Sequence, residues 1–137
     1  MALGDRPLLP PRVLLVMPDQ WARALLRAAL RDVGYDAVGT RTLESALRVR
    51  ADDPERGAIR LIIIDQPTLG DADSGEQLAQ LLAHHGAPKT LLLARATIDA
   101  VAGPWQNVLR RPVSVADVVA ATAALLPLAA ADRRPLD

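Results

Sequence analysis

The sequence contains no cysteine and no phenylalanine, and its single lysine is Lys89. Without cysteine the chain forms no disulfide, no thiolate metal site and no cysteine nucleophile. Aromatic residues make up only 2% of the chain, so the core must be built from Leu, Val, Ile and Ala. The formal net charge is zero, which argues against a general polyanion-binding surface and so against nucleic-acid binding by this domain alone.

Long apolar runs are also absent, because none approaches the roughly 20 residues of a membrane-spanning helix. Residues 1–11 contain three prolines and do not resemble a secretory signal. We therefore expect a cytoplasmic protein with no membrane segment. The 137 residues, half of them hydrophobic, suit one domain. We expect a disordered leader over 1–11, a folded domain over 12–126 and a flexible tail over 127–137.

Hydrophobic patterning predicts five strands that alternate with helices. Short apolar runs predict strands at 12–17, 35–39, 61–64, 90–93 and 105–109. Helical spacing predicts helices at 20–33, 42–50, 76–85 and 115–126, and a weak one at 96–102 that Gly103-Pro104 stops. Residues 51–58 and 66–74 are expected to be loops. Asp19 is expected to cap the first helix and Gly34 to end it.

This alternation predicts a flavodoxin-like, doubly wound, five-stranded parallel sheet, (βα)5, with a short or degenerate fourth helix. In such sheets reactive groups gather beyond the carboxyl ends of the strands. Asp65 follows the most apolar strand. The other residues at these ends are Met17, Pro18, Asp19, residues 93–96 and residues 110–112.

The stretch RVLLVMPDQWARALLRAALRDVGYDAV, together with LIIIDQP, Gly75 and LRRPVSVADVV, resembles the receiver domain of two-component response regulators, the CheY-like superfamily. The resemblance covers residues 12–126. It implies that an aspartate accepts a phosphoryl group. It further implies a Mg²⁺ ion held by acidic residues after the first strand, a Ser or Thr after the fourth, and a Lys-Pro pair after the fifth.

By this resemblance Asp65 matches the phosphate acceptor, but its surroundings depart from the family pattern. The acidic pair falls on Met17 and Pro18, which supply no side-chain oxygen. The hydroxyl position falls on Leu93 or Ala94, and the Lys-Pro pair on Arg111-Pro112. A guanidinium is larger than an ammonium and planar, so the last change is not neutral. The resemblance also implies a cis peptide bond before Pro112, and an ion pair between Asp65 and Arg111 is one interpretation of the aspartate.

The main hypothesis is an atypical receiver, or pseudo-receiver, in two-component signal transduction. It would act through protein–protein interaction, with no catalytic residues and no cofactor, and its partner would be a histidine kinase or an effector domain. An alternative is a phosphorylatable Asp65 with a rebuilt Mg²⁺ site that uses Asp19 and Asp71, with Asp73 nearby. A further alternative is a small-molecule site at the strand ends. No Gly-rich loop follows the first strand, which argues against a nucleotide there.

The final helix is apolar nearly all round, with Asp117 as its one charged residue. A helix of this kind is usually covered on both sides, although alanine also simply favours helix. The residues expected to face the sheet are Val115, Val118, Val119, Thr122 and Leu126. The residues expected to form a second, possible homodimer face are Ala116, Ala120, Ala121, Ala123 and Ala124.

Two further groups have ordinary interpretations. His84 and His85 end the third helix, where they favour the helix dipole and are expected to be exposed to solvent. Arg23, Arg27 and Arg31 form one row on the first helix. This row is interpreted as a solvated face or as a docking stripe for an acidic partner.

Overall fold

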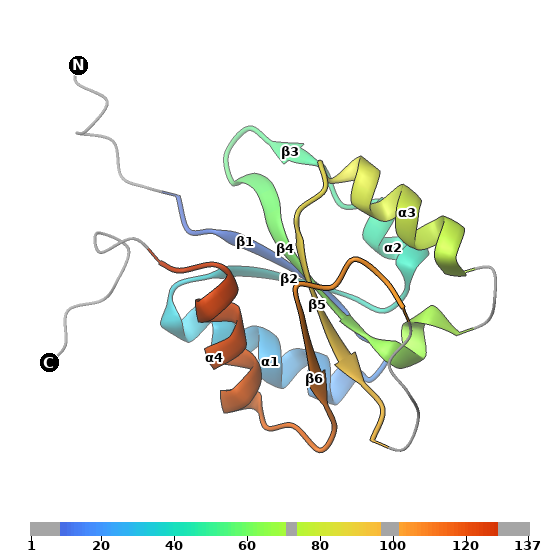
Figure 1. The fold of residues 1–137 in the computed structure, drawn as a ribbon. Coiled ribbons are helices and arrows are strands. Elements are labelled where there is room, and N and C mark those ends of the chain that lie inside the picture. The colour runs from blue at the N-terminus through green and yellow to red at the C-terminus, as the bar shows by residue number, and fades with distance from the viewer. Residues whose placement is uncertain (1–8, 71–73, 97–101, 129–137) are drawn as a thin grey trace, which may run out of the picture.

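The computed structural model describes residues 9–70, 74–96 and 102–128. A parallel sheet runs in the order β2-β1-β4-β5-β6. Its strands are β1 (Arg12–Val16), β2 (Asp36–Thr40), β4 (Gly57–Asp65), β5 (Lys89–Ala94) and β6 (Asn107–Arg110). Helices α1 (Gln20–Val33) and α4 (Val115–Leu125) cover one face, and α2 (Leu43–Leu47) and α3 (Ser74–His84) cover the other (Figure 1). The predicted doubly wound parallel sheet is confirmed.

The central strands are buried on both faces, as their continuous apolar sequences predict. Along β1, Val13 and Leu15 pack with α1 and α4, whereas Leu14 and Val16 pack with α2 and α3. Burying each such side chain stabilises the fold by about 1.5–3 kcal/mol. Within the described ranges no helix has the length and apolar character needed to cross a membrane.

Local side-chain chemistry sets the helix ends. The Asp19 carboxylate accepts the backbone N–H groups of Trp21 and Ala22 at 2.9 and 3.2 Å. Gly34 ends α1 at a φ of 117°, which a side chain would disfavour. Ser114 and Asp117 form a capping box at the start of α4. These caps fix where α1 and α4 begin, and so how both helices leave the carboxyl edge of the sheet.

The predicted loop at 51–58 was wrong in part. It contains β3 (Asp52–Asp53), which pairs antiparallel with the start of β4. The Asp53 carboxylate accepts the N–H groups of Glu55 and Arg56 and closes the turn. As a result β4 is nine residues long, more than twice the predicted strand. The hairpin could not be predicted from hydrophobic patterning. Its residues are mostly charged, and it is stabilised by side-chain capping and not by alternating apolar residues.

Three other predictions differ from the structure, and a fourth falls outside the described residues. The second helix ends at Leu47, well before residue 50. A short 3-10 helix, η2 (Gln66–Leu69), occupies part of the predicted loop after Asp65. The weak helix at 96–102 falls mainly on residues 97–101, outside the described residues. Leu128, expected in the tail, packs against the core.

The expected exposure of both histidines was wrong for His85, which is 4% exposed. Its Nε2 lies 3.2 Å from the carbonyl oxygen of Ala46, so Nε2 carries the proton and donates it. Its buried Nδ1 has no hydrogen-bond partner in the described part of the chain. Burial lowers the pKa of His85 from its usual 6.5, and the Ala46 carbonyl only partly offsets this.

The lowered pKa of His85 predicts a loss of stability in mild acid. Since the folded state binds this proton less readily than the unfolded state, the free energy of unfolding should fall as pH decreases below about 6.5. Urea unfolding at pH 7.5 and in mild acid, for wild type and His85→Gln, measures the difference. The variant should lose less stability on acidification than wild type, and His84→Gln is the matched control. Equal pH dependence of wild type and His85→Gln would contradict this.

Candidate functional site

Asp65 is buried at the carboxyl end of β4, in the middle of the sheet. It is 3% exposed, and its register partner on β5 is Leu93. Met17 follows the end of β1, the neighbour of β4 on the other side. The ends of three central strands therefore converge around one carboxylate, as the fold requires.

The partner of this carboxylate is Arg111, which follows β6. One guanidinium nitrogen, NH2, lies 2.9 Å from Oδ1 of Asp65. The N–H does not meet hydrogen-bond geometry, and Oδ1 accepts no other hydrogen bond from the described residues, so the contact is an ion pair. The backbone N–H of Arg111 donates to Ala94, and the peptide bond before Pro112 is cis. The side chain of Asp65 is 5% exposed and that of Arg111 37%. The buried carboxylate is therefore paired with a cation that is partly exposed to solvent.

The walls around the ion pair offer little that could bind a metal ion. Met17 and Leu93 are buried in the core cluster that α1 and α4 cover. Ala94 is buried on the opposite face, and Pro18 is exposed. Mg²⁺ requires several oxygen ligands in octahedral geometry. None of these four side chains carries an oxygen atom.

The rebuilt metal site finds no support among the described residues. Both hydrogen bonds that cap α1 end on Oδ1 of Asp19. Asp71 and Asp73 lie outside the described residues. Across 9–70, 74–96 and 102–128 there is no group of three acidic, His or Cys side chains placed to hold a metal ion.

Several hydrogen bonds near Asp65 were not predicted from the sequence. The Gln66 side chain accepts the backbone N–H of Arg95 at 2.9 Å and ties the end of β4 to the end of β5. The Thr68 hydroxyl donates to the carbonyl of Asp65 at 2.6 Å. Arg110 donates to the carbonyl of Arg95 at 3.2 Å. These contacts form from loop geometry, and no residue spacing signals them.

A cavity of about 190 Å³ lies beside the ion pair, between α1 and the start of α4. Met17, Leu93 and Arg111 line it, whereas Asp65 does not. Small-molecule sites usually measure about 300–1,000 Å³. The cavity is therefore smaller than a typical ligand site, and most of the side chains around it are apolar.

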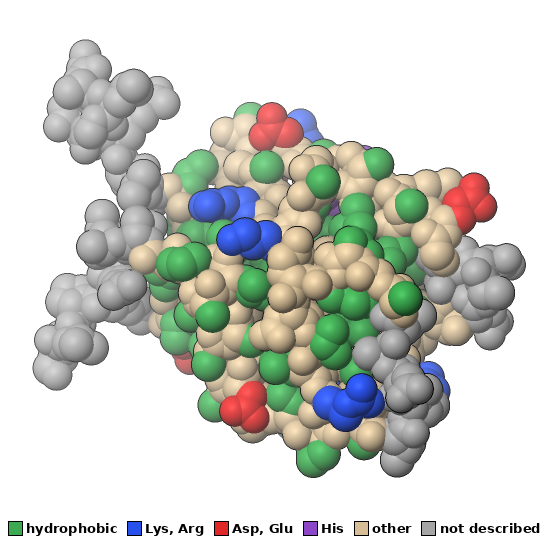
Figure 2. All heavy atoms as spheres, viewed as in Figure 1, with side chains coloured by type: hydrophobic (Ala, Val, Ile, Leu, Met, Phe, Trp, Pro, Cys, Tyr) green, Lys and Arg blue, Asp and Glu red, His purple; other side chains and the backbone are tan. Residues whose placement is uncertain are grey.

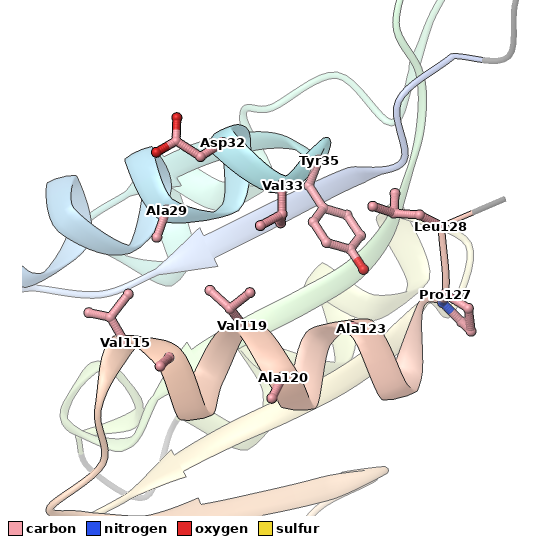
Figure 3. Close-up of a pocket in the computed structure, with 11 residues that line it drawn as sticks. Ala29, Asp32, Val33, Tyr35, Val115, Val119, Ala120, Ala123, Pro127 and Leu128 are labelled. Carbon is pink, nitrogen blue, oxygen red and sulfur yellow. The ribbon is translucent and has the colours of Figure 1, made fainter. Parts of the chain in front are cut away.

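A larger hollow, the α1–α4 groove, runs between the two helices and measures about 700 Å³. Figure 3 shows Ala29 and Val33 of α1 pointing towards Val119 of α4, with Tyr35 at one end. The Tyr35 hydroxyl donates to the carbonyl of Leu126 at 2.7 Å and holds the end of α4 in place. The other residues that line the groove are Asp32, Val115, Ala116, Ala120, Ala123, Pro127 and Leu128.

The α1–α4 groove opens onto a surface with exposed apolar side chains. Trp21 is 74% exposed, Leu25 47% and Val33 41%. These residues recur at helical spacing along one side of α1, in line with Ala29. The groove and this stripe together form one apolar surface.

Four of the five predicted interface residues on α4 are exposed: Ala116, Ala120, Ala123 and Ala124. The fifth, Ala121, was wrong, because it is buried in the core. Val115 was expected to face the sheet but is 37% exposed. Since α4 is apolar nearly all round, it has no polar face from which its rotation about its own axis could be predicted.

The comparisons with known proteins found structural similarity alone. No protein-family model and no curated protein matches the sequence. A response regulator receiver protein from Burkholderia phymatum has a TM-score of 0.67 at 25% identity, over 87% of this chain and 97% of its own. A receiver domain protein from Clostridium thermocellum has a TM-score of 0.65 at 15% identity, over 85% and 94%. An orphan response regulator of H. pylori has a TM-score of 0.63 at 17% identity, over 85% and 96%.

The ion pair predicts a clear coupling between its two residues. Arg111→Met should lower the free energy of unfolding by about 2 kcal/mol, because it leaves a buried carboxylate without its cation. This is less than the roughly 3–5 kcal/mol typical of fully buried pairs, since Arg111 is partly exposed. Asp65→Asn combined with Arg111→Met should recover about 1 kcal/mol or more relative to the summed single losses. Urea unfolding of the four proteins gives this coupling, and strictly additive losses would contradict it.

Proposed function

Since the chain has the fold of response regulator receiver domains, we propose that it is an atypical receiver that signals by binding another protein. In this proposal Asp65 is not phosphorylated by a Mg²⁺-dependent reaction. The observation that carries the proposal is the ion pair, because the guanidinium of Arg111 already lies 2.9 Å from the buried carboxylate. The partner class is a signalling protein such as a histidine kinase or an effector domain.

Electrostatics supports this proposal. A carboxylate attacks a phosphodonor poorly because both are negative, and Mg²⁺ ordinarily offsets that repulsion. Here the strand ends supply a thioether and a proline where a metal would need oxygen ligands. The guanidinium of Arg111 is planar and carries a single positive charge, and it is already paired with the Asp65 carboxylate. A metal ion would have to displace the guanidinium without gaining an adequate set of ligands.

A phosphate-dependent change of shape is also disfavoured. In a working switch a hydroxyl near the acceptor would bond the new phosphate and move with it. Leu93 and Ala94 carry no hydroxyl and are buried in the core. Thr90, at the other end of β5, already donates to the carbonyl of Pro104 at 2.6 Å.

Exposure to a small phosphodonor and Mg²⁺ should leave the mass of the intact protein unchanged, because Asp65 is already paired. Intact-protein mass spectrometry makes the measurement, and a receiver domain with a complete acidic pair is the positive control for the donor. Arg111→Lys tests whether the guanidinium alone blocks the reaction, and it should also remain unmodified. A stoichiometric phosphoryl adduct on the wild type that is lost in Asp65→Asn would overturn the proposal.

A second proposal concerns self-association: the α1–α4 groove and the exposed face of α4 would pack against a second copy of this chain. Charged atoms are sparse over α4, with acidic atoms near its first turn and basic atoms beyond its end (Figure 2). Asp117 lies in the first turn, and the ammonium of Lys89 donates to the carbonyl of Leu125 at the last turn. An antiparallel two-fold pairing of α4 helices would place Asp117 of each copy near Lys89 of the other, and would also oppose the helix dipoles.

Self-association should therefore depend on the exposed face of α4. Ala120→Glu places a charge on the groove wall and should shift a concentration-dependent dimer to monomer in sedimentation velocity. Ala83→Glu, at an exposed site on α3 on the opposite side of the sheet, is the matched control and should leave the dimer intact. A wild-type monomer at high concentration, or a dimer that both variants retain, would contradict this interface.

A further inference from the structure

A third hollow, the arginine groove, measures about 330 Å³ and lies along β2 on the side of α1. Three arginines line it, Arg23 and Arg27 from α1 and Arg56 from the turn between β3 and β4. Its remaining lining residues are Gln20, Ala24, Val38 and Gly39. The row expected from the sequence was Arg23, Arg27 and Arg31, so the fold replaces Arg31 with an arginine from a distant segment.

Each of the three guanidinium groups is held by one hydrogen bond. Arg23 donates to the carbonyl of Met17 at 2.7 Å, and Arg27 to the carbonyl of Ala37 at 3.0 Å. Arg56 donates to the carboxylate of Asp36 at 2.8 Å. A guanidinium has five N–H donors, so one anchoring bond fixes its position and leaves donors for a ligand. The groove is thus preorganised for negative charge.

The acidic group beneath the groove does not cancel this charge. Asp36 pairs with Arg56, but it also lies 3.5 Å from the guanidinium of Arg12, which is almost fully buried. Asp36 is therefore shared between two cations, and no acidic residue lines the groove. Among the described residues that line the groove, three carry a positive charge and none carries a negative charge.

Gly39 lets Arg23 lie across β2. A Cβ atom at this position would come within 3.0 Å of Cδ and 3.1 Å of Cγ of Arg23. A side chain there would require Arg23 to shift by a few tenths of an ångström from its present position. Substituting Gly39 would therefore move the guanidinium of Arg23 without changing the charge of the protein.

The backbone at this edge argues against a peptide strand as the ligand. β2 ends the strand order, so one of its edges faces away from the sheet. The backbone groups of Asp36 and Thr40 form hydrogen bonds on the side of β1. Because alternate residues of a strand point their backbone groups to opposite sides, the carbonyl of Ala37 points away from the sheet. That carbonyl already accepts a hydrogen bond from Arg27. Arginine at such an edge blocks strand addition. A compact anion does not need that edge.

We propose that the arginine groove binds a small molecule that carries two or more phosphoryl groups. The three cations are anchored at Asp36, at Ala37 and at Met17, which lies beside Thr40, so they are spread along β2 and are not gathered at one point. That spread suits linked phosphoryl groups better than a single phosphate. The planar fork of each guanidinium matches the oxygen geometry of a phosphoryl group. The volume is that of a small-ligand site.

Calorimetric titration with inorganic tripolyphosphate tests this proposal, with orthophosphate and a poly-glutamate peptide as comparison ligands. Tripolyphosphate should bind more tightly than either. Arg27→Gln and Arg56→Gln should each weaken binding by about tenfold, the loss expected for a charge-assisted bond. Arg31→Gln, on the same helix but outside the groove, is the matched control and should change the affinity by less than about twofold. Thermal melts establish that each variant is folded.

Gly39→Ala distinguishes binding at a preorganised site from general electrostatic attraction of the anion to the protein. It keeps every charge but displaces Arg23, so tripolyphosphate affinity should fall several-fold while that of Arg31→Gln stays near wild type. Absence of binding at millimolar tripolyphosphate would overturn the proposal. The arginines of the groove would then serve only to protect the edge strand β2 from pairing with another chain. Equal losses in Arg31→Gln and the groove variants would also overturn it, and so would tighter binding of poly-glutamate, which would indicate an acidic protein partner.

Discussion

The ion pair between Asp65 and Arg111 is the contact on which the carboxyl edge of the sheet depends. It joins the ends of β4 and β6, next to the buried side chains of Met17 and Leu93. A buried carboxylate without a cation would be costly. The chain supplies that cation from its own sequence, where a working phosphoacceptor site would recruit a metal ion. In the proposed function, the same contact that stabilises the edge also keeps the acid out of phosphotransfer chemistry.

If the strand ends carry no switch, function must reside on the outer surfaces, and α1 contributes to both of the prominent ones. Ala29 and Val33 line the apolar α1–α4 groove. Arg23 and Arg27, on another side of the same helix, line the arginine groove. A ligand in the arginine groove and a second copy against α4 would thus act on one helix. α1 could couple the two proposed sites, provided that it shifts as a unit.

The sequence predicted what periodicity and capping determine. Five strands, the Asp19 cap and the Gly34 end of α1 follow from local residue preferences, and the Asp65–Arg111 pair followed from a position-by-position resemblance. Burial of His85 did not follow, because two adjacent histidines at a helix end give no sign of which one faces the neighbouring helix. The arginine groove was not predicted either. Arg56 reaches it from the hairpin of β3 and β4, and the charged sequence of that hairpin had been interpreted as a loop. Tertiary contacts of this kind have no sequence period.

In the proposed function Arg111, and no metal ion, balances the charge of Asp65. Titration of the isotope-labelled protein with Mg²⁺, followed by the backbone amide shifts of residues 17, 65, 93 and 111, tests it most directly. If Arg111 balances this charge, no saturable shift should occur at these four amides at millimolar Mg²⁺. A saturable shift centred on Asp65, absent in Asp65→Asn, would show instead that the metal competes with the guanidinium.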